Sequence, residues 1–278
     1  MQLQVTILAD NAAGRGPLRG ESGLSVMIES PTRNYLFDTG LGRLFYQNAR
    51  HIGVELYGVD NIILSHGHYD HSNGLPWAFE ECPRAHLILH EKALERKYSS
   101  STGKLRYIGI NKRTLKLISE ADQTGKVSFL KSKPLHFPDA IIFSTGGREH
   151  FPSDWNFYLD SPDGPVFDNF EDEISLLING KDCAMLFVGC SHCQLSEIVK
   201  KAATLTDKPI RYILGGSHLN KVTDDEIDFT ADFFRKRPEC TLFLGHCTGI
   251  SGFSRLYHAL NGINIHPFNS GWQANFNL

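Results

Sequence analysis

One short run of the sequence gathers four side chains that could bind metal ions. The run is Ser65-His66-Gly67-His68-Tyr69-Asp70-His71, and its candidate ligands are His66, His68, Asp70 and His71. It follows an apolar stretch at residues 61–64 that is typical of a buried strand. In extended backbone, residues two apart point to the same side, so His66 and His68 could reach one cation together. A turn that brings Asp70 and His71 back toward a second cation would complete a two-metal site.

The types of ligand indicate which metals and which chemistry to expect. Imidazole and carboxylate suit zinc, manganese or iron, whereas calcium prefers oxygen ligands. Two such ions would lower the pKa of a water molecule between them and polarise a carbonyl or phosphoryl oxygen. Asp70 could also accept the proton of the attacking water. We therefore expect two divalent ions, zinc before manganese or iron, and hydrolysis of a small ester, phosphoester or lactone.

Other interpretations of the candidate residues stay open at this point. The G-x-S-x-G pattern of a serine hydrolase fails around Ser191, because Cys193 stands in place of the last glycine. Cys190 and Cys193 form a bare C-x-x-C, which could be a redox pair or could pack beside a metal. A non-catalytic module that only holds metal and a phosphorylated or pterin-like ligand would carry the same histidine run. Activity that vanishes with a chelator and returns with zinc or manganese would exclude that module.

The composition excludes several classes of protein. The chain has 278 residues, 41% of them hydrophobic and 21% charged, which is enough for a sizeable core. A net charge of −3 argues against a nucleic-acid binder. We find neither an apolar run near the ~20 residues of a membrane span nor a secretory signal. We therefore expect one cytoplasmic domain over residues 1–278 with cysteines present as thiols, a small-molecule substrate, and no nucleic-acid or membrane partner; the oligomeric state stays open.

Apolar stretches and turn residues predict the elements that must position these side chains. Strands are expected at residues 3–8, 24–29, 34–37, 61–64, 141–143, 174–178, 184–188, 210–214 and 241–244. Helical spacing predicts helices at residues 91–98, 111–121, 195–205 and 224–237. Strands mixed with helices in both halves indicate an α/β protein with two similar halves. Residues 146–170, with Trp155, Phe157 and Tyr158, are expected to form a long loop or an aromatic lid.

The histidine run also resembles a known signature. It is similar to the HxHxDH motif of the metallo-β-lactamase superfamily, and Asp38-Thr39-Gly40 looks like the Asp-Thr-Gly that precedes the motif. Further stretches resemble the dihydropterin synthase-like branch: Asp10-Asn11, Gly23-Leu24-Ser25, Gly189-Cys190-Ser191-His192, Gly215-Gly216-Ser217-His218-Leu219 and His246-Cys247-Thr248-Gly249. The resemblance implies a four-layer αββα sandwich with a dinuclear site at one edge between two sheets. It also implies a hydrolase or, alternatively, a transferase that displaces diphosphate from a pterin.

The resemblance implies that further ligands come from strand ends in the second half. His192 follows the strand at 184–188 and His246 follows the strand at 241–244, so both are expected to bind metal. In the superfamily an acidic residue at an equivalent strand end bridges the metals, but this chain has Cys190 in that region and no aspartate. A thiolate from Cys190, or water alone, would then bridge. His218 also lies at a strand end, where it could bind substrate or act as an acid.

Supporting residues are expected around these ligands. A carboxylate beside metal-bound imidazoles more often orients a ligand than binds the metal, so Asp38 is expected to orient one of them. The resemblance places Asn11, Glu21 and Ser25 near the mouth of the site, although all three are also ordinary turn residues. Positive groups available for a phosphate are Arg15, Arg19, Lys112, Arg113 and Arg148.

Overall fold

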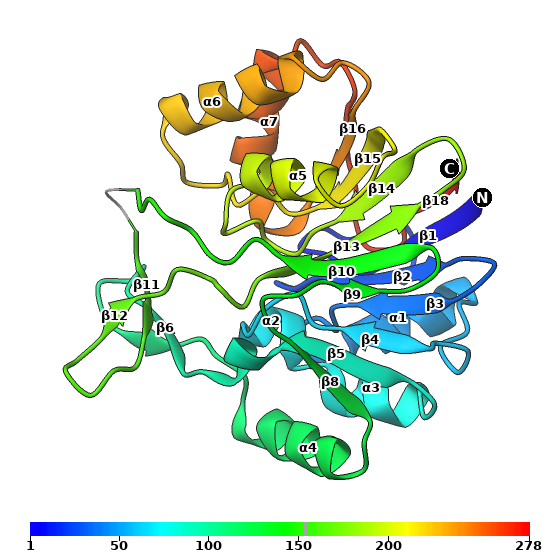
Figure 1. The fold of residues 1–278 in the computed structure, drawn as a ribbon, viewed down its shortest axis with the longest axis vertical. Helices are drawn as coiled ribbons and strands as arrows, with labels where there is room; N and C mark the ends of the chain where they lie inside the picture. Colours follow the sequence, from blue (N-terminus) through cyan, green and yellow to red (C-terminus); the bar gives the residue numbers. More distant parts are fainter. Residues whose placement is uncertain (153–154) are drawn as a thin grey trace.

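Two large sheets form the centre of the molecule in the computed structural model, which describes residues 1–152 and 155–278 (Figure 1). The first has seven strands in the order β18 (Gln273–Asn277), β1 (Gln2–Ala9), β2 (Ser25–Glu29), β3 (Asn34–Phe37), β4 (Asn61–Ile63), β5 (His86–His90) and β8 (Val127–Leu130). The second also has seven, in the order β17 (Ile265–Pro267), β16 (Thr241–Leu244), β15 (Ile210–Gly215), β14 (Ala184–Phe187), β13 (Ile174–Asn179), β10 (Ala140–Ser144) and β9 (Leu135–His136). The two sheets correspond to the two similar halves expected from the sequence.

Helices cover the outer face of each sheet (Figure 1). The helices on the first sheet are α1 (Leu44–Ile52), α3 (Leu75–Glu81) and α4 (Lys112–Gln123), and those on the second are α5 (Leu195–Ala203), α6 (Asp224–Arg235) and α7 (Gly249–Ala259). Apolar side chains fill three layers, one between the sheets and one beneath each set of helices. Burial of this apolar area is the main force that holds the layers together. The structure is therefore a four-layer αββα sandwich, as the resemblance implies.

A third, smaller sheet lies at one end of the sandwich near the short helix α2 (Tyr69–Ser72) (Figure 1). Its four strands are β12 (Val166–Phe167), β11 (Phe157–Leu159), β6 (Lys97–Ser99) and β7 (Arg106–Tyr107). The segment 146–170 was expected to be a loop or lid, and it supplies two of these strands. Within that segment, residues 153 and 154 lie outside the described residues.

Each predicted strand coincides with an observed one, with small differences at the ends. The helices predicted at 111–121, 195–205 and 224–237 correspond to α4, α5 and α6. The helix predicted at 91–98 is wrong, because only the 3-10 turn η1 (Glu91–Leu94) forms and β6 follows it. The helix does not form over residues 95–98 because β6 pairs with β11 there. The buried ammonium of Lys97 forms ion pairs with Asp168 and Asp172.

Three helices carry no clear signal in the sequence. The helices α1, α3 and α7 all begin without a side-chain cap, and α7 includes Gly252. Their helical state depends on packing against the sheets, which a local pattern does not report. No helix in the described part of the chain has the length and apolar character of a membrane span.

Candidate metal centre

The candidate residues meet where parallel strands end. In the first sheet β3, β4 and β5 run parallel, and in the second sheet β14, β15 and β16 do the same. Asp38 follows β3, the histidine run follows β4, and His192, His218 and His246 follow β14, β15 and β16. Carboxyl ends of parallel strands form the usual ligand-binding edge of an α/β sheet. This topology brings residues from both halves to one edge of the sandwich.

Backbone strain is concentrated at this edge. Eight described residues other than glycine have a positive φ, and six of them lie here: Asp38, Phe170, Ser191, Gln194, His218 and His246. Their φ values lie between 51° and 68°, in the left-handed region that disfavours side chains. Such strain persists only where the surrounding structure enforces it, and it clusters at functional sites. The pattern marks this edge independently of the histidine motif.

Three imidazoles form what we call the three-histidine position: His66, His68 and His192. One ring nitrogen from each lies within 4.8 Å of the others, and all three side chains are buried. In the described part of the chain, Nε2 of His66, Nε2 of His68 and both ring nitrogens of His192 have no hydrogen-bond partner. Buried polar atoms are almost always paired in proteins. The unpaired nitrogens therefore fit a metal ion better than a purely structural role.

Gly67 allows His66 and His68 to face the same point. A Cβ atom at residue 67 would lie 2.2 Å from the carbonyl oxygen of Ala93, so no side chain fits there. The backbone N–H of Gly67 donates to Oδ2 of Asp172 at 2.8 Å, and the hydroxyl of Ser65 contacts Nδ1 of His66 at 2.9 Å. These contacts fix the loop, and the Ser65 contact leaves Nε2 of His66 directed at the site.

Five residues form what we call the mixed position: Asp70, His71, Cys190, His246 and Cys247. Nε2 of His71 lies 3.0 Å from Nε2 of His246 and 3.2 Å from Sγ of Cys190. Oδ2 of Asp70 lies 3.8 Å from Nε2 of His246. Three overlapping groups of ligand atoms within 4.8 Å of one another include these residues. The two positions are adjacent, because the rings of His66 and His71 have centroids 4.2 Å apart.

Asp38 contacts His71 rather than the centre of either position. Nδ1 of His71 donates to Oδ2 of Asp38 at 2.7 Å, and Asp38 also accepts hydrogen bonds from the N–H and hydroxyl of Ser65. Burial lowers the pKa of His71, but the carboxylates of Asp38 and Asp70 outweigh this and raise it to about 9. Asp38 thus lies where a residue that orients His71 is expected.

The other supporting residues have unequal roles. Oδ1 of Asn11 accepts from Nδ1 of His246 at 2.9 Å, so Asn11 directs Nε2 of that ring toward the mixed position. The hydroxyl of Ser25 donates to the carbonyl oxygen of Asp38 at 2.9 Å. Glu21 accepts from the N–H of Leu41 at 3.0 Å and so supports a neighbouring loop. Asn11 therefore contacts a candidate ligand, whereas Ser25 acts through Asp38.

Burial keeps most of the candidate imidazoles neutral. It is the largest cause of the lowered pKa values of His66, His68, His192 and His246, and the nearby histidines add to it. Neutral imidazole is the form that binds metal. These four rings are thus in the binding form at neutral pH without any change in protonation.

Sequence reasoning missed the segment that supports the three-histidine position, residues 168–173. Oε1 of Glu173 accepts from the N–H of His192 at 2.9 Å, and the ring of Phe170 stacks on that of His192 with centroids 3.8 Å apart. The buried ammonium of Lys97 lies 2.7 Å from Asp168 and 2.9 Å from Asp172. The only signal in the sequence is the placement of three carboxylates just before the apolar strand β13.

A pocket of about 820 Å³ opens beside the centre. Its lining includes His68, Asp70, Cys190, His192, His218 and Cys247 from the centre, with Trp155, Phe157, Arg106, Arg148 and Lys221 around them. The ring of His218 lies 4.4 Å from that of His192 between centroids. Of the basic residues expected to meet a phosphate, Arg148 is the one among the described lining residues, and its guanidinium donates to the carbonyl oxygens of His192 and His150. The pocket therefore combines candidate metal ligands, aromatic side chains and charged side chains of both signs, the acidic ones besides Asp70 being Glu197, Asp225 and Glu226.

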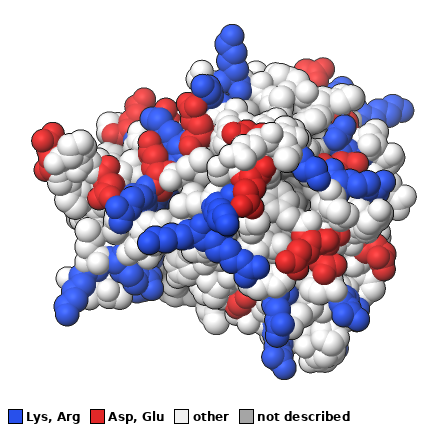
Figure 2. Space-filling view, turned by 90° about the horizontal axis from the view of Figure 1, so that it is seen from below, with Lys and Arg blue, Asp and Glu red and all other residues white. Residues whose placement is uncertain are grey.

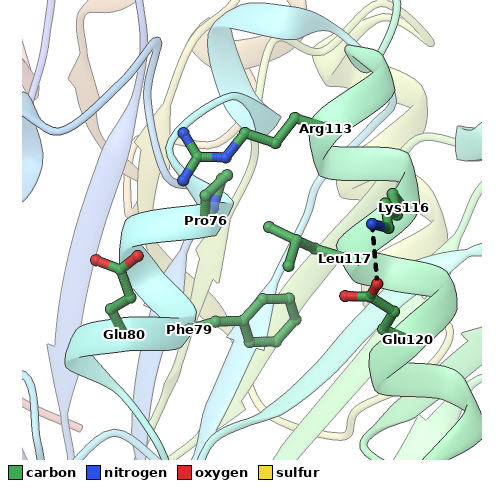
Figure 3. Close-up of a pocket in the computed structure, with 7 residues that line it drawn as sticks. All are labelled: Pro76, Phe79, Glu80, Arg113, Lys116, Leu117 and Glu120. Atoms are coloured by element: carbon green, nitrogen blue, oxygen red, sulfur yellow. Dashed lines mark ion pairs between the residues drawn. The ribbon is translucent and has the colours of Figure 1, made fainter.

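A second groove shares no described lining residue with this pocket. It has a volume of about 380 Å³ and lies between α3 and α4, lined by Pro76, Phe79, Glu80, Arg113, Lys116, Leu117 and Glu120 (Figure 3). An ion pair joins Lys116 to Glu120 at 3.6 Å (Figure 3). Acidic and basic side chains are interspersed over the face shown in Figure 2. Arg113, one of the basic residues expected to meet a phosphate, belongs to this groove.

Comparison with known proteins yields related families and folds. The model of the metallo-beta-lactamase superfamily matches residues 18–161. An uncharacterised protein of Methanocaldococcus jannaschii is 29% identical over 265 residues, which are 94% of this chain and 97% of that protein. The 7,8-dihydropterin-6-methyl-4-(beta-D-ribofuranosyl)-aminobenzene-5'-phosphate synthase of the same organism is 26% identical over 262 residues, 89% of this chain and 88% of the synthase. The crystal structure of a metal-dependent hydrolase of the beta-lactamase superfamily superposes with a TM-score of 0.83 and 25% identity, covering 99% of this chain and 100% of that one.

Proposed function

The chain belongs to the metallo-beta-lactamase superfamily, and on this premise we propose that it is a metal-dependent hydrolase with two divalent ions, zinc before manganese or iron. His66, His68 and His192 would hold one ion, and the mixed position would hold the other. One observation carries the proposal: buried imidazole nitrogens without partners in the described chain converge on one point. Water molecules alone could satisfy these nitrogens, but they would not explain why three buried imidazoles converge on one point.

The residues of the centre suggest how a reaction would proceed. When bound, the ions would supply Lewis acidity toward a carbonyl or phosphoryl oxygen and lower the pKa of a water molecule. Asp70 lines the pocket and, through a carboxylate oxygen, would accept the proton of the attacking water. His218 lines the same pocket beside His192 and would donate a proton to the leaving group. Phe157, with its ring 5.6 Å from that of His218, would exclude bulk water from that side.

The pocket supports a small substrate with a flat or apolar part and a negative charge. Phe157 and Trp155 offer ring faces on one side. Arg106 and Lys221 line the same pocket and would attract a phosphate or carboxylate. The guanidinium of Arg148 is engaged with the carbonyl oxygens of His192 and His150 and with the carboxylate of Glu226, so it would act mainly by holding the loop of His192. A small ester or phosphoester fits this combination.

A second function is favoured by one specific comparison. The synthase of Methanocaldococcus jannaschii is similar to this chain over most of both sequences. A transferase of that kind would displace diphosphate from a pterin-methyl diphosphate, and the same two ions would neutralise the charge of the departing diphosphate. The aromatic side chains of the pocket would stack on the pterin ring. Hydrolysis and transfer thus differ in whether water or a second substrate attacks.

Metal removal tests the proposal directly. Protein stripped with a chelator should lose activity in a screen of phosphomonoesters, phosphodiesters, lactones and thioesters, and zinc or manganese should restore it. His68→Ala should lose metal and activity together, whereas His258→Ala, at an exposed histidine on α7, should keep both. An active His68→Ala variant with two bound ions would contradict the site assignment.

A paired assay separates the two reactions. A pterin-methyl diphosphate is incubated with the metal-loaded protein, first alone and then with a ribofuranosyl-aminobenzene phosphate. A hydrolase releases diphosphate at the same rate in both mixtures, because water is the acceptor. A transferase releases it only, or much faster, when the second substrate is present, and it forms the coupled product.

A further inference from the structure

Two cysteines face the mixed position, whereas the other four have ordinary surroundings. Cys82 and Cys183 pack in apolar layers, Cys193 donates to the carbonyl oxygen of Phe170, and Cys240 donates to that of Ile210. Cys190 and Cys247 lie among candidate ligands at the edge of the pocket, and the thiol of Cys247 donates to the carbonyl oxygen of Cys190 at 3.4 Å. A metal site built only from histidine and aspartate would not require these two cysteines.

The sulfur atoms lie at ligand distances from the imidazoles. Sγ of Cys190 is 3.2 Å from Nε2 of His71. Sγ of Cys190, Sγ of Cys247 and a ring nitrogen of His246 all lie within 4.8 Å of one another. Ligands of a tetrahedral zinc ion with bonds of 2.0–2.3 Å lie roughly 3.5 Å apart. The spacing therefore matches that of side chains that share one ion.

The backbone is shaped to hold Cys247 in this place. A Cβ atom at Gly216 would lie 2.4 Å from Sγ of Cys247, so the glycine makes room for the sulfur. His246, at the start of the 3-10 turn η2 (His246–Thr248), has a φ of 51°, and its N–H donates to Oδ1 of Asp10 at 2.6 Å. The same turn thus presents an imidazole and a thiol toward one point.

We propose that the mixed position is a thiolate site, in which Cys190, Cys247 and His246, with His71 as the fourth ligand, bind a thiophilic divalent ion such as zinc or cadmium. Each thiol would lose its proton to solvent as its sulfur–metal bond forms, so that the two thiols release two protons. Thiolate ligands select zinc and cadmium over manganese and magnesium, which prefer oxygen. The inference rests on the proposed function, because it specifies which ion the second position of that centre takes.

Cobalt(II) provides a direct probe, because cobalt–thiolate bonds give a charge-transfer band in the near ultraviolet. Metal-free, reduced protein is titrated with cobalt, and both the band and the bound metal are measured. The wild type should bind two equivalents and show the band. In Cys247→Ser and in Cys190→Ser, the band should have about half of its wild-type intensity. One of the two cobalt equivalents should bind about 100-fold more weakly. Cys240→Ser removes a buried thiol elsewhere and should match the wild type.

The outcomes separate this inference from the proposed function. Two bound cobalt ions without the band would overturn the thiolate site and leave the two-metal centre standing. No bound cobalt would overturn both. A wild-type band that is unchanged in both serine variants would also overturn the inference, because the thiolates would then lie elsewhere.

Alkylation of the wild type tests the site without any substitution. Cys247 is partly exposed, so iodoacetamide should modify it in the metal-free protein. Zinc should protect it at least tenfold, as measured by mass spectrometry of its peptide, and magnesium should not. Equal rates of modification with and without zinc would overturn the proposal even if a serine variant failed to fold.

Discussion

The three-histidine position and the mixed position lie side by side but are built from different chemistry. The first consists of three imidazoles whose pKa values are lowered, with burial as the largest cause. The second combines carboxylate, imidazole and thiol, and its His71 has a pKa raised to about 9 by Asp38 and Asp70 against the effect of burial. In the metal-free protein at neutral pH, the first position is therefore neutral and the second holds an imidazolium.

The two positions also differ in what supports them. Behind the three-histidine position lies a buried ion cluster, in which Lys97 contacts Asp168 and Asp172, and Asp172 accepts from the N–H of Gly67. Behind the mixed position lie separate hydrogen bonds, from His71 to Asp38 and from His246 to Asn11 and Asp10. The first position depends on a network within the fold, whereas the second depends on individual partners. Substitutions in the two regions should therefore have different kinds of effect.

The largest effect is expected for Lys97→Met. Removing the ammonium leaves Asp168 and Asp172 buried without their cation, and breaking a buried pair in this way costs about 3–5 kcal/mol. The free energy of unfolding of the metal-free protein, measured with urea, should fall by that amount. Lys92→Met is the matched control, because the Lys92–Glu171 pair is 39% and 37% exposed and should contribute less than about 1 kcal/mol. Equal losses in the two variants would show that the buried cluster contributes no more to stability than an exposed ion pair.

The histidine run could be predicted because its information is local. Alternation along an extended backbone is enough to pair His66 with His68, and the next turn supplies Asp70 and His71. His192 and His246 required the resemblance, because their positions become meaningful only once strand ends are known to meet. The order of strands in each sheet decides that, and it is a property of the whole chain.

The supporting cluster could not be predicted from local patterns. Lys97 and Asp168 are 71 residues apart in the sequence and meet because β6 and β11 pair in the third sheet. Residues 91–98 were predicted as a helix from helical spacing alone, and that spacing carries no sign that Lys97 is buried. Cys247 is a different case from Lys97. It stands next to His246 in the sequence, but it is not part of a spaced motif that would predict a metal ligand.

The next effect is a loss of stability between pH 6.5 and about 9 that arises from His71 of the mixed position and not from the imidazoles of the three-histidine position. The pKa of His71 is 6.5 in its ordinary state and about 9 in the folded, metal-free protein. Its contribution to stability is complete below pH 6.5 and is lost as the pH rises through the folded value of about 9. The free energy of unfolding of the metal-free protein should therefore fall by up to about 3 kcal/mol over this window.

The imidazoles of the three-histidine position do not contribute to this loss, because their folded pKa values lie below the window. Urea unfolding at pH 7, 8 and 9 measures the effect. Zinc-loaded protein should not show this loss, since metal binding excludes the proton from His71. A metal-free protein whose stability is constant from pH 7 to 9 would contradict the raised pKa and remove this difference between the positions.

The smallest effect, and the finest test of the comparison, is expected for Asp38→Asn. The amide can still accept a hydrogen bond, but it no longer carries the charge that orients and polarises His71. Loss of such a partner weakens metal binding about 10–100-fold. In a competition titration with a chromophoric chelator, one of the two metal equivalents should show this weaker affinity. Asp122→Asn, at an exposed carboxylate on α4, should leave both equivalents unchanged.

Asp38→Asn should also weaken metal binding at the three-histidine position, but by less than at the mixed position. Ser65 donates to Asp38 through both its N–H and its hydroxyl, and that hydroxyl also contacts Nδ1 of His66. Asp38 and Ser65 therefore link the two positions, since the Ser65 hydroxyl also lies 3.5 Å from Nδ1 of His71. A loss confined to one equivalent would mean that each position is supported separately. An equal loss in both would mean that Ser65 transmits the change, and that the two positions act as one unit.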